Sequence, residues 1–92
     1  MDMATVQFPR HLTNQLSMLE SCEATGRTVA EVVEDLERQH PGVRSYLLDD
    51  HGEVRQHVNL FIGDQWLQDR KSLSDPIAES DTLFIMQALS GG

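Results

Sequence analysis

The chain has 92 residues, which is enough for one domain with a single modest hydrophobic core. Fifteen acidic residues against seven basic ones give a formal net charge of −8, which argues against nucleic acid because phosphate binding needs a basic surface. The one cysteine, Cys22, excludes an internal disulfide, and no apolar run is long enough to span a membrane. We therefore expect a cytoplasmic globular domain that binds neither nucleic acid nor membrane.

Two strands are expected before the first helix, over residues 4–8 and 17–24. The first alternates with Val6 and Phe8 on one face, and it ends at Pro9 because proline has no N–H group to donate. The second is expected to be antiparallel to the first. Its inward-facing side chains are predicted to be Met18, Cys22 and Ala24.

A helix over residues 28–39 is the clearest predicted element. Thr28, followed three residues later by Glu31, forms a capping box at its N-terminus. Pro41-Gly42 ends it. Four apolar residues at positions i, i+3, i+4 and i+7 form one stripe that should pack against a sheet, namely Val29, Val32, Val33 and Leu36.

Residues 43–57 favour a short helical turn followed by a polar loop at 49–52. A third strand is predicted over residues 58–62, and a turn over residues 63–65 closes it. Trp66 then begins a short return segment.

The final strand is expected over residues 82–89, with Leu83 and Ile85 on one parity and Phe84 and Met86 on the other. The element order is then strand, strand, helix, strand, short strand, strand. This order is that of an α+β, β-grasp (ubiquitin-like) fold. We expect a mixed sheet of four to five strands, with the last strand central beside the first and one main helix packed on one face.

The sequence ends with Ser90, Gly91 and Gly92, which have almost no side chain to pack. Two glycines make a thin, extended arm whose terminal carboxylate can enter a narrow active site where any Cβ atom would clash. We therefore expect residues 1–89 to form the domain and residues 90–92 to form a flexible diglycine arm. A frayed terminus without a role is the alternative.

Together these features resemble the ubiquitin-like sulfur carrier proteins (MoaD/ThiS-like). That family includes the small subunit of molybdopterin synthase and the carriers of thiamin thiazole synthesis and of a cysteine pathway. In length the chain is closest to the cysteine-synthesis and molybdopterin-type carriers. The resemblance rests on the order and spacing of four segments: Thr-Val-x-Glu-Val-Val-x-x-Leu at 28–36, Val58-Asn59 followed by Gly63-Asp64, the turn at 73–77, and the terminal Leu89-Ser90-Gly91-Gly92.

The resemblance implies that this chain is a protein cosubstrate and not an enzyme, with no catalytic side chain and no bound cofactor. An adenylating enzyme of the MoeB/ThiF type would use ATP to join the Gly92 carboxylate to AMP. A persulfide sulfur from a cysteine desulfurase or rhodanese-like protein would replace AMP and leave a thiocarboxylate. A sulfur-acceptor enzyme of cysteine, molybdopterin or thiamin biosynthesis would take that sulfur.

Two alternatives share the predicted fold. One is a protein modifier, which is activated in the same way but joined through Gly92 to lysine amines. The other is a ubiquitin-like interaction domain whose tail is inert.

A partner-binding surface is expected on the open side of the sheet. If Leu83 and Ile85 face the helix, then Phe84 and Met86 face away from it, beside Phe61. One helix covers only one face of a sheet, and an exposed apolar patch usually marks a binding surface. The family resemblance implies that this face meets the adenylating enzyme.

The histidines, the other acidic residues and the cysteine are interpreted as structural or solvent-exposed residues. The four histidines lie in four segments without metal-binding spacing, so no metal site is predicted. Asp49, Asp50 and Glu53 lack the regular alternate-position ligands of a calcium loop. Cys22 is expected to be a small buried residue, because no histidine is near it in sequence. The acidic side of the 28–39 helix is interpreted as a solvated face, with docking as the alternative.

Overall fold

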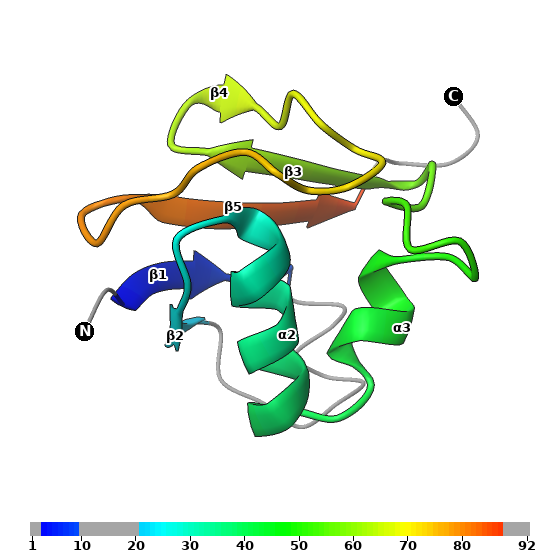
Figure 1. Cartoon of the computed structure of the whole chain (residues 1–92), viewed down its shortest axis with the longest axis horizontal. Coiled ribbons are helices and arrows are strands. Elements are labelled where there is room, and N and C mark those ends of the chain that lie inside the picture. Colours follow the sequence, from blue (N-terminus) through cyan, green and yellow to red (C-terminus); the bar gives the residue numbers. More distant parts are fainter. Residues whose placement is uncertain (1–2, 10–20, 88–92) are drawn as a thin grey trace.

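The computed structural model describes residues 3–9 and 21–87, which form a five-stranded mixed sheet crossed on one face by a helix (Figure 1). The elements are β1 Met3–Gln7, β2 Ser21–Thr25, α2 Val29–Gln39, α3 Val43–Leu47, β3 Val58–Ile62, β4 Gln65–Trp66 and β5 Thr82–Gln87. Within these residues no helix is both long enough and apolar enough to cross a membrane.

The last strand lies at the centre of the sheet, whose order is β2-β1-β5-β3-β4. β5 runs parallel to β1, with Val6 opposite Leu83, and antiparallel to β3, with Leu60 opposite Ile85. β1 and β2 are antiparallel. Parallel neighbours need a long crossover connection, and α2 lies within it. The predicted β-grasp arrangement is confirmed.

The strand limits differ slightly from those predicted. β1 ends at Gln7, one residue before the predicted end, although Phe8 is still buried. β2 begins at Ser21, and the first four residues of the predicted 17–24 strand lie outside the described part of the chain. The last two residues of the predicted 82–89 strand also lie outside it. The prediction that Gln65 belongs to a turn is wrong.

Gln65 instead begins β4 and pairs with Ile62. The turn between them consists of Gly63 and Asp64 only. Gly63 has φ +63°, in the left-handed region that glycine adopts without steric cost. A turn of two residues places the flanking residues directly opposite each other.

Capping bonds begin α2 where the sequence predicts. Thr28 Oγ1 accepts a hydrogen bond from the N–H of Glu31 at 3.3 Å. The Glu31 carboxylate accepts one from the N–H of Arg27 at 2.8 Å, one residue before the bond expected in a capping box. The first two N–H groups of α2 donate to the carbonyls of Asp75 and Leu73 at 3.0 and 2.9 Å, so the loop before β5 closes this helix end.

One hydrophobic core fills the space between α2 and the sheet. The four residues of the predicted helix stripe are all at most 1% exposed. Leu60, Leu83 and Ile85 meet them from the sheet and are equally buried. The 3.6-residue period of the helix and the two-residue period of the strands therefore point into the same core.

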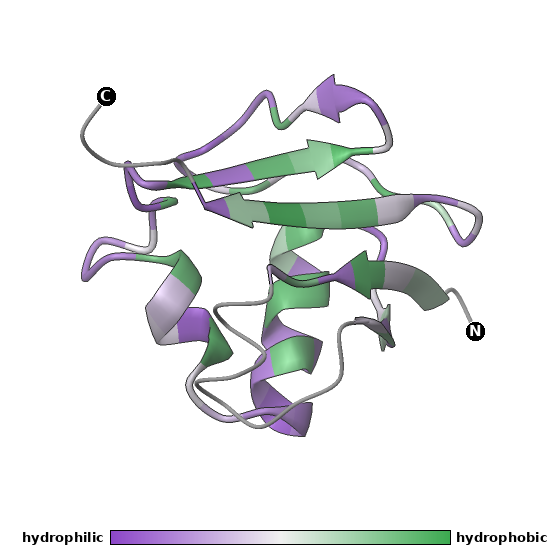
Figure 2. Ribbon diagram, turned by 180° about the vertical axis from the view of Figure 1, so that it is seen from behind, coloured by the Kyte–Doolittle hydropathy of each residue, from purple (hydrophilic) through white to green (hydrophobic). Residues whose placement is uncertain are grey.

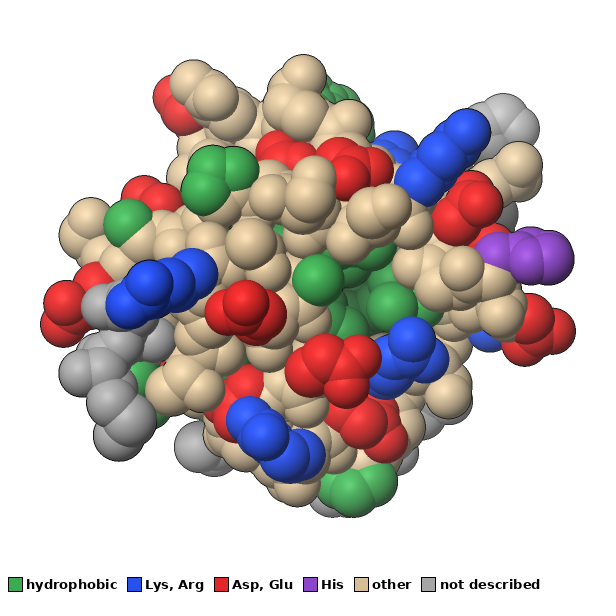
Figure 3. Space-filling model, viewed as in Figure 1, with side chains coloured by type: hydrophobic (Ala, Val, Ile, Leu, Met, Phe, Trp, Pro, Cys, Tyr) green, Lys and Arg blue, Asp and Glu red, His purple; other side chains and the backbone are tan. Residues whose placement is uncertain are grey.

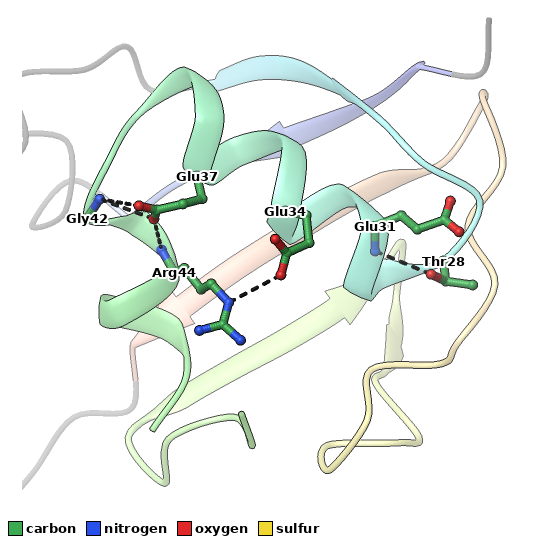
Figure 4. Close-up of polar contacts among 6 residues, drawn as sticks. All are labelled: Thr28, Glu31, Glu34, Glu37, Gly42 and Arg44. Atoms are coloured by element: carbon green, nitrogen blue, oxygen red, sulfur yellow. Dashed lines mark hydrogen bonds and ion pairs between the residues drawn. The ribbon is translucent and has the colours of Figure 1, made fainter. Parts of the chain in front are cut away.

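The predicted helical turn after α2 is α3, and acidic side chains of α2 hold it in place. The Glu37 carboxylate accepts hydrogen bonds from the N–H groups of Gly42 and Arg44, at 3.2 and 2.9 Å. The Arg44 guanidinium donates to Glu34 at 3.2 Å (Figure 4). The two bonds to Glu37 satisfy backbone N–H groups at the beginning of α3, which have no partner within the helix.

Candidate functional site

The open face of the sheet carries the three residues predicted for partner binding. Phe61 of β3 lies opposite Phe84 of β5, and Met86 follows on the same face of β5. Their neighbours Leu83 and Ile85 are 0% and 1% exposed, whereas Met86 is 51% exposed. The predicted parity of the final strand is confirmed, and the structure brings the three side chains to one face.

Trp66 adds to this surface, although the sequence placed it only in a return segment. It lies opposite Phe61 in the β3–β4 register, with ring centroids 4.3 Å apart and ring planes inclined by 42°. The residue is 57% exposed. A two-residue turn at positions 63–64 would have predicted this pairing, because it sets residue 61 opposite residue 66. We call Phe61, Trp66, Phe84 and Met86 the sheet patch.

Polar but uncharged side chains border the sheet patch. Gln7 of β1 lies opposite Phe84, and Asn59 of β3 lies opposite Met86. Figure 2 views the sheet from this side, with the strands in front of α2. An apolar area with uncharged neighbours resembles the centre of a protein–protein interface, where charged residues are depleted.

The helix side of the molecule has a different character. Acidic and basic side chains are interspersed there (Figure 3). The carboxylate of Asp35 accepts hydrogen bonds from the N–H of Thr25 at 3.0 Å, the Arg38 guanidinium at 2.7 Å and the Gln39 amide at 2.9 Å. These bonds, the Thr25 N–H foremost, hold the pKa of Asp35 below its usual range. The acidic side of α2 thus attaches the helix to β2 and α3.

The predicted covalent site lies outside the described residues. Its members are Ser90, Gly91 and Gly92. The last described residue is Gln87, which ends β5 and pairs with Val58 of β3. In the sequence, two residues separate the end of this central strand from the predicted arm.

Cys22 lies on β2 opposite Val6 and packs against the core. Burial raises the pKa of its thiol, and the nearby carboxylates of Asp35 and Glu23 raise it further. A raised pKa disfavours the thiolate that a nucleophile or a metal ligand needs. Among residues 3–9 and 21–87, no three side chains of metal-binding type are grouped to hold an ion.

The carboxylate of Asp49 closes the polar loop after α3. Its Oδ1 atom accepts hydrogen bonds from the N–H groups of His51 and Glu53, at 2.8 and 3.1 Å. These bonds, with that of Glu53 foremost, lower the pKa of Asp49. Gly52 completes the turn with φ +81°. Asp49 Oδ1, a possible calcium ligand, therefore already accepts two backbone hydrogen bonds.

Comparison with known proteins extends over nearly the whole chain. The model of the ThiS family matches residues 6–92. The sulfur carrier protein CysO of Mycobacterium tuberculosis is 30% identical over 90 residues, which cover 96% of this chain and 97% of that protein.

Solved structures agree with this match. A chain in the crystal structure of the Amycolatopsis orientalis BexX/CysO complex is similar with a TM-score of 0.85 and 29% identity, covering 97% of this chain and 99% of that chain. The crystal structure of Mycobacterium tuberculosis CysO is similar with a TM-score of 0.83 and 28% identity, covering 94% and 99% of the two chains. The similarity therefore extends over the whole domain and is not limited to a local motif.

Proposed function

The chain belongs to the ThiS family, and on that premise we propose that it is a sulfur carrier protein whose reactive group is the carboxylate of Gly92. The observation that carries this proposal is the extent of the match. The family model reaches residue 92, and the matched region covers 97% of the CysO relative. The similarity thus includes both the domain and the segment proposed as its reactive arm.

In the proposed reaction, the Gly92 carboxylate attacks the α-phosphorus of ATP in an adenylating enzyme of the MoeB/ThiF type, and pyrophosphate leaves. The resulting acyl-adenylate has an electrophilic carbonyl carbon with AMP as its leaving group. A persulfide sulfur, from a cysteine desulfurase or rhodanese-like protein, attacks this carbon and releases AMP. A thiol then reduces the acyl disulfide and frees the thiocarboxylate, which a sulfur-acceptor biosynthetic enzyme consumes.

In this proposal the chain supplies recognition and a reactive end, and the partner enzymes supply the catalysis. Glycines contribute little binding energy, so the domain must be held elsewhere while the arm enters the active site. The sheet patch is suited to this role because two of its residues, Phe84 and Met86, belong to the strand that leads into the arm. The BexX/CysO complex, in which a similar chain was crystallised, supports binding to a protein partner.

Intact mass spectrometry of the full chain tests the proposal. With the adenylating enzyme and ATP we expect one AMP adduct, and with a persulfide donor the exchange of one oxygen atom for sulfur. Deleting Gly92 should abolish both products and leave the melting temperature unchanged, because the described core is formed by residues before Gln87. An adduct on the truncated chain would overturn the proposal. High-mass lysine conjugates without a free thiocarboxylate would instead identify a protein modifier.

A further inference from the structure

A side-chain hydrogen bond attaches the end of β5 to α3. Tyr46 Oη donates to Gln87 Oε1 at 3.1 Å, between residues 41 positions apart in the chain. The His57 ring packs edge-on against the Tyr46 ring, with centroids 6.1 Å apart and planes at 84°. Burial raises the pKa of the Tyr46 phenol, so the hydroxyl remains a donor at neutral pH. The last described residue of the chain is therefore held from the helix side.

Among the described strands, fewer support the end of β5 than support the residues before it. β1 pairs with β5 only as far as Phe84, which lies opposite Gln7. β3 pairs with β5 as far as Gln87. Within the described sheet, the residues from Ile85 onward thus have one strand neighbour in place of two. A strand end with one neighbour opens more easily, so a further contact at Gln87 restricts its motion.

The residue opposite Gln87, Val58, is also held by a side chain. The Arg70 guanidinium donates to the carbonyl oxygens of Val58 and Arg55, at 2.8 and 2.7 Å. Arg55 Nε donates in turn to the Ser45 carbonyl of α3 at 3.0 Å. Hydrogen bonds from a charged guanidinium are stronger than neutral ones. We call the following residues the arm-root cluster: Tyr46, Arg55, His57, Arg70 and Gln87.

We infer that the arm-root cluster positions the arm for the proposed reaction, with Tyr46 as the positioning residue. This inference rests on the proposed function, because only a reactive chain end makes the direction of the residues after Gln87 important. Five extended residues span at most about 18 Å. The position of Gln87 therefore limits the region that Gly92 can reach when the sheet patch is bound to the partner.

The sheet patch and the arm-root cluster then have separable effects. Contacts of the patch decide how tightly the domain binds its partner. The arm-root cluster decides in what fraction of bound complexes the chain end reaches the ATP site, because an arm that starts from a restrained residue loses less entropy when it enters. Loss of the Tyr46 bond should therefore slow the reaction within the complex without weakening the complex.

Tyr46→Phe tests this separation, since it keeps the ring against His57 and removes only the hydroxyl. With the MoeB/ThiF-type adenylating enzyme of the same organism, we expect the Kd to change by less than about twofold. The single-turnover rate of AMP-adduct formation at saturating enzyme should fall about fivefold, the usual effect of one hydrogen bond. The order parameter of the Gln87 amide, measured by NMR on the free chain, should fall relative to that of Ile85.

Matched variants identify the cause. Gln87→Ala should slow the reaction as much as Tyr46→Phe, and the double variant should be no slower than either single one, because both remove the same bond. Arg44→Ala is the control for loosening of α3, since it removes the Arg44–Glu34 pair but keeps the Glu37 bonds to this helix and the Tyr46–Gln87 bond. It should keep the full rate.

Two outcomes would overturn this inference and leave the proposed function standing. One is a Tyr46→Phe variant that reacts at the wild-type rate while the wild-type chain forms the adduct. The other is a Tyr46→Phe variant whose Gln87 amide is as ordered as that of the wild type. A wild-type chain that forms no adduct overturns the proposed function, and the inference with it.

Discussion

Trp66 packs against Phe61 with ring centroids 4.3 Å apart and tilted ring planes, and the two residues lie on strands joined by a turn of two residues. The contact keeps both rings on the open face, where Trp66 is 57% exposed. Aromatic side chains are the commonest anchors of protein interfaces because they bury large areas with little loss of rotamer freedom. Trp66 therefore enlarges the apolar surface predicted from Phe61, Phe84 and Met86.

Truncation of the sheet patch should weaken partner binding and spare the fold. Trp66→Ala, Phe84→Ala and Met86→Ala should each reduce the free energy of binding to the adenylating enzyme by about 1–3 kcal/mol. Their effect on the free energy of unfolding should be smaller than the roughly 2–5 kcal/mol of a core truncation. Calorimetric titration beside thermal melts checks both quantities for each variant.

Gln7→Ala provides the matched control for the patch, because Gln7 lies opposite Phe84 on the same face but is polar. It should leave affinity nearly unchanged. If a patch variant lost stability as a core truncation does, while binding per folded molecule stayed constant, that residue would be a packing residue and the patch would be smaller than proposed.

Leu36→Asp should unfold the domain. Leu36 is 0% exposed in the centre of the helix stripe, and an unpaired carboxylate there costs several kcal/mol of a total stability of about 5–15 kcal/mol. Glu34→Asp introduces the same side chain on the exposed side of α2 and should cost at most about 1 kcal/mol. Circular dichroism melts compare the two, and a cooperative transition for Leu36→Asp would show that the core face is assigned wrongly.

The loop before β5 should give the protein a characteristic acid sensitivity. Asp69 accepts hydrogen bonds from the Ser74 hydroxyl and from the N–H groups of Ser74, Ser72 and Lys71. These bonds, the Ser74 hydroxyl foremost, lower the pKa of Asp69 from 3.8 to about 2. Because the pKa is lower in the folded state, this contribution to stability is fully present above about pH 4 and is lost as the pH falls towards 2.

Urea unfolding between pH 2 and 5 measures that contribution. Asp69→Asn should flatten the decline in the free energy of unfolding, and Ser74→Ala should flatten it partly, because it removes the main cause of the pKa shift. A curve for Asp69→Asn that runs parallel to the wild type over this range would remove Asp69 from the explanation.

Cys22 should behave as a packing residue. Burial and two neighbouring carboxylates raise the pKa of its thiol, so iodoacetamide should alkylate it several-fold more slowly in the native chain than in urea. Cys22→Ala should retain adenylate and thiocarboxylate formation. A folded Cys22→Ala chain that accepts AMP but no sulfur would show that this thiol takes part in sulfur transfer.

Elements that follow from a local period can be predicted from the amino-acid sequence. The stripe from Val29 to Leu36 and the alternation of Leu83 and Ile85 with Phe84 and Met86 predicted which side chains enter the core. Each pattern depends on residues within a few positions of one another, and the geometry of a helix or strand then decides the face. The two terminal glycines, from which the arm is predicted, are likewise a feature of the sequence, and the family match includes them.

The contacts between these elements are seen only in the folded domain. The contact of Trp66 with Phe61 depends on a turn of two residues where three were predicted. The bond from Tyr46 to Gln87 depends on where α3 lies beside the end of β5, and Glu31 bonds to Arg27 where the capping box predicted Thr28. Such contacts are set by strand register and by the packing of distant segments, which no local period encodes. A one-residue difference in a turn changes the partner of every residue beyond it.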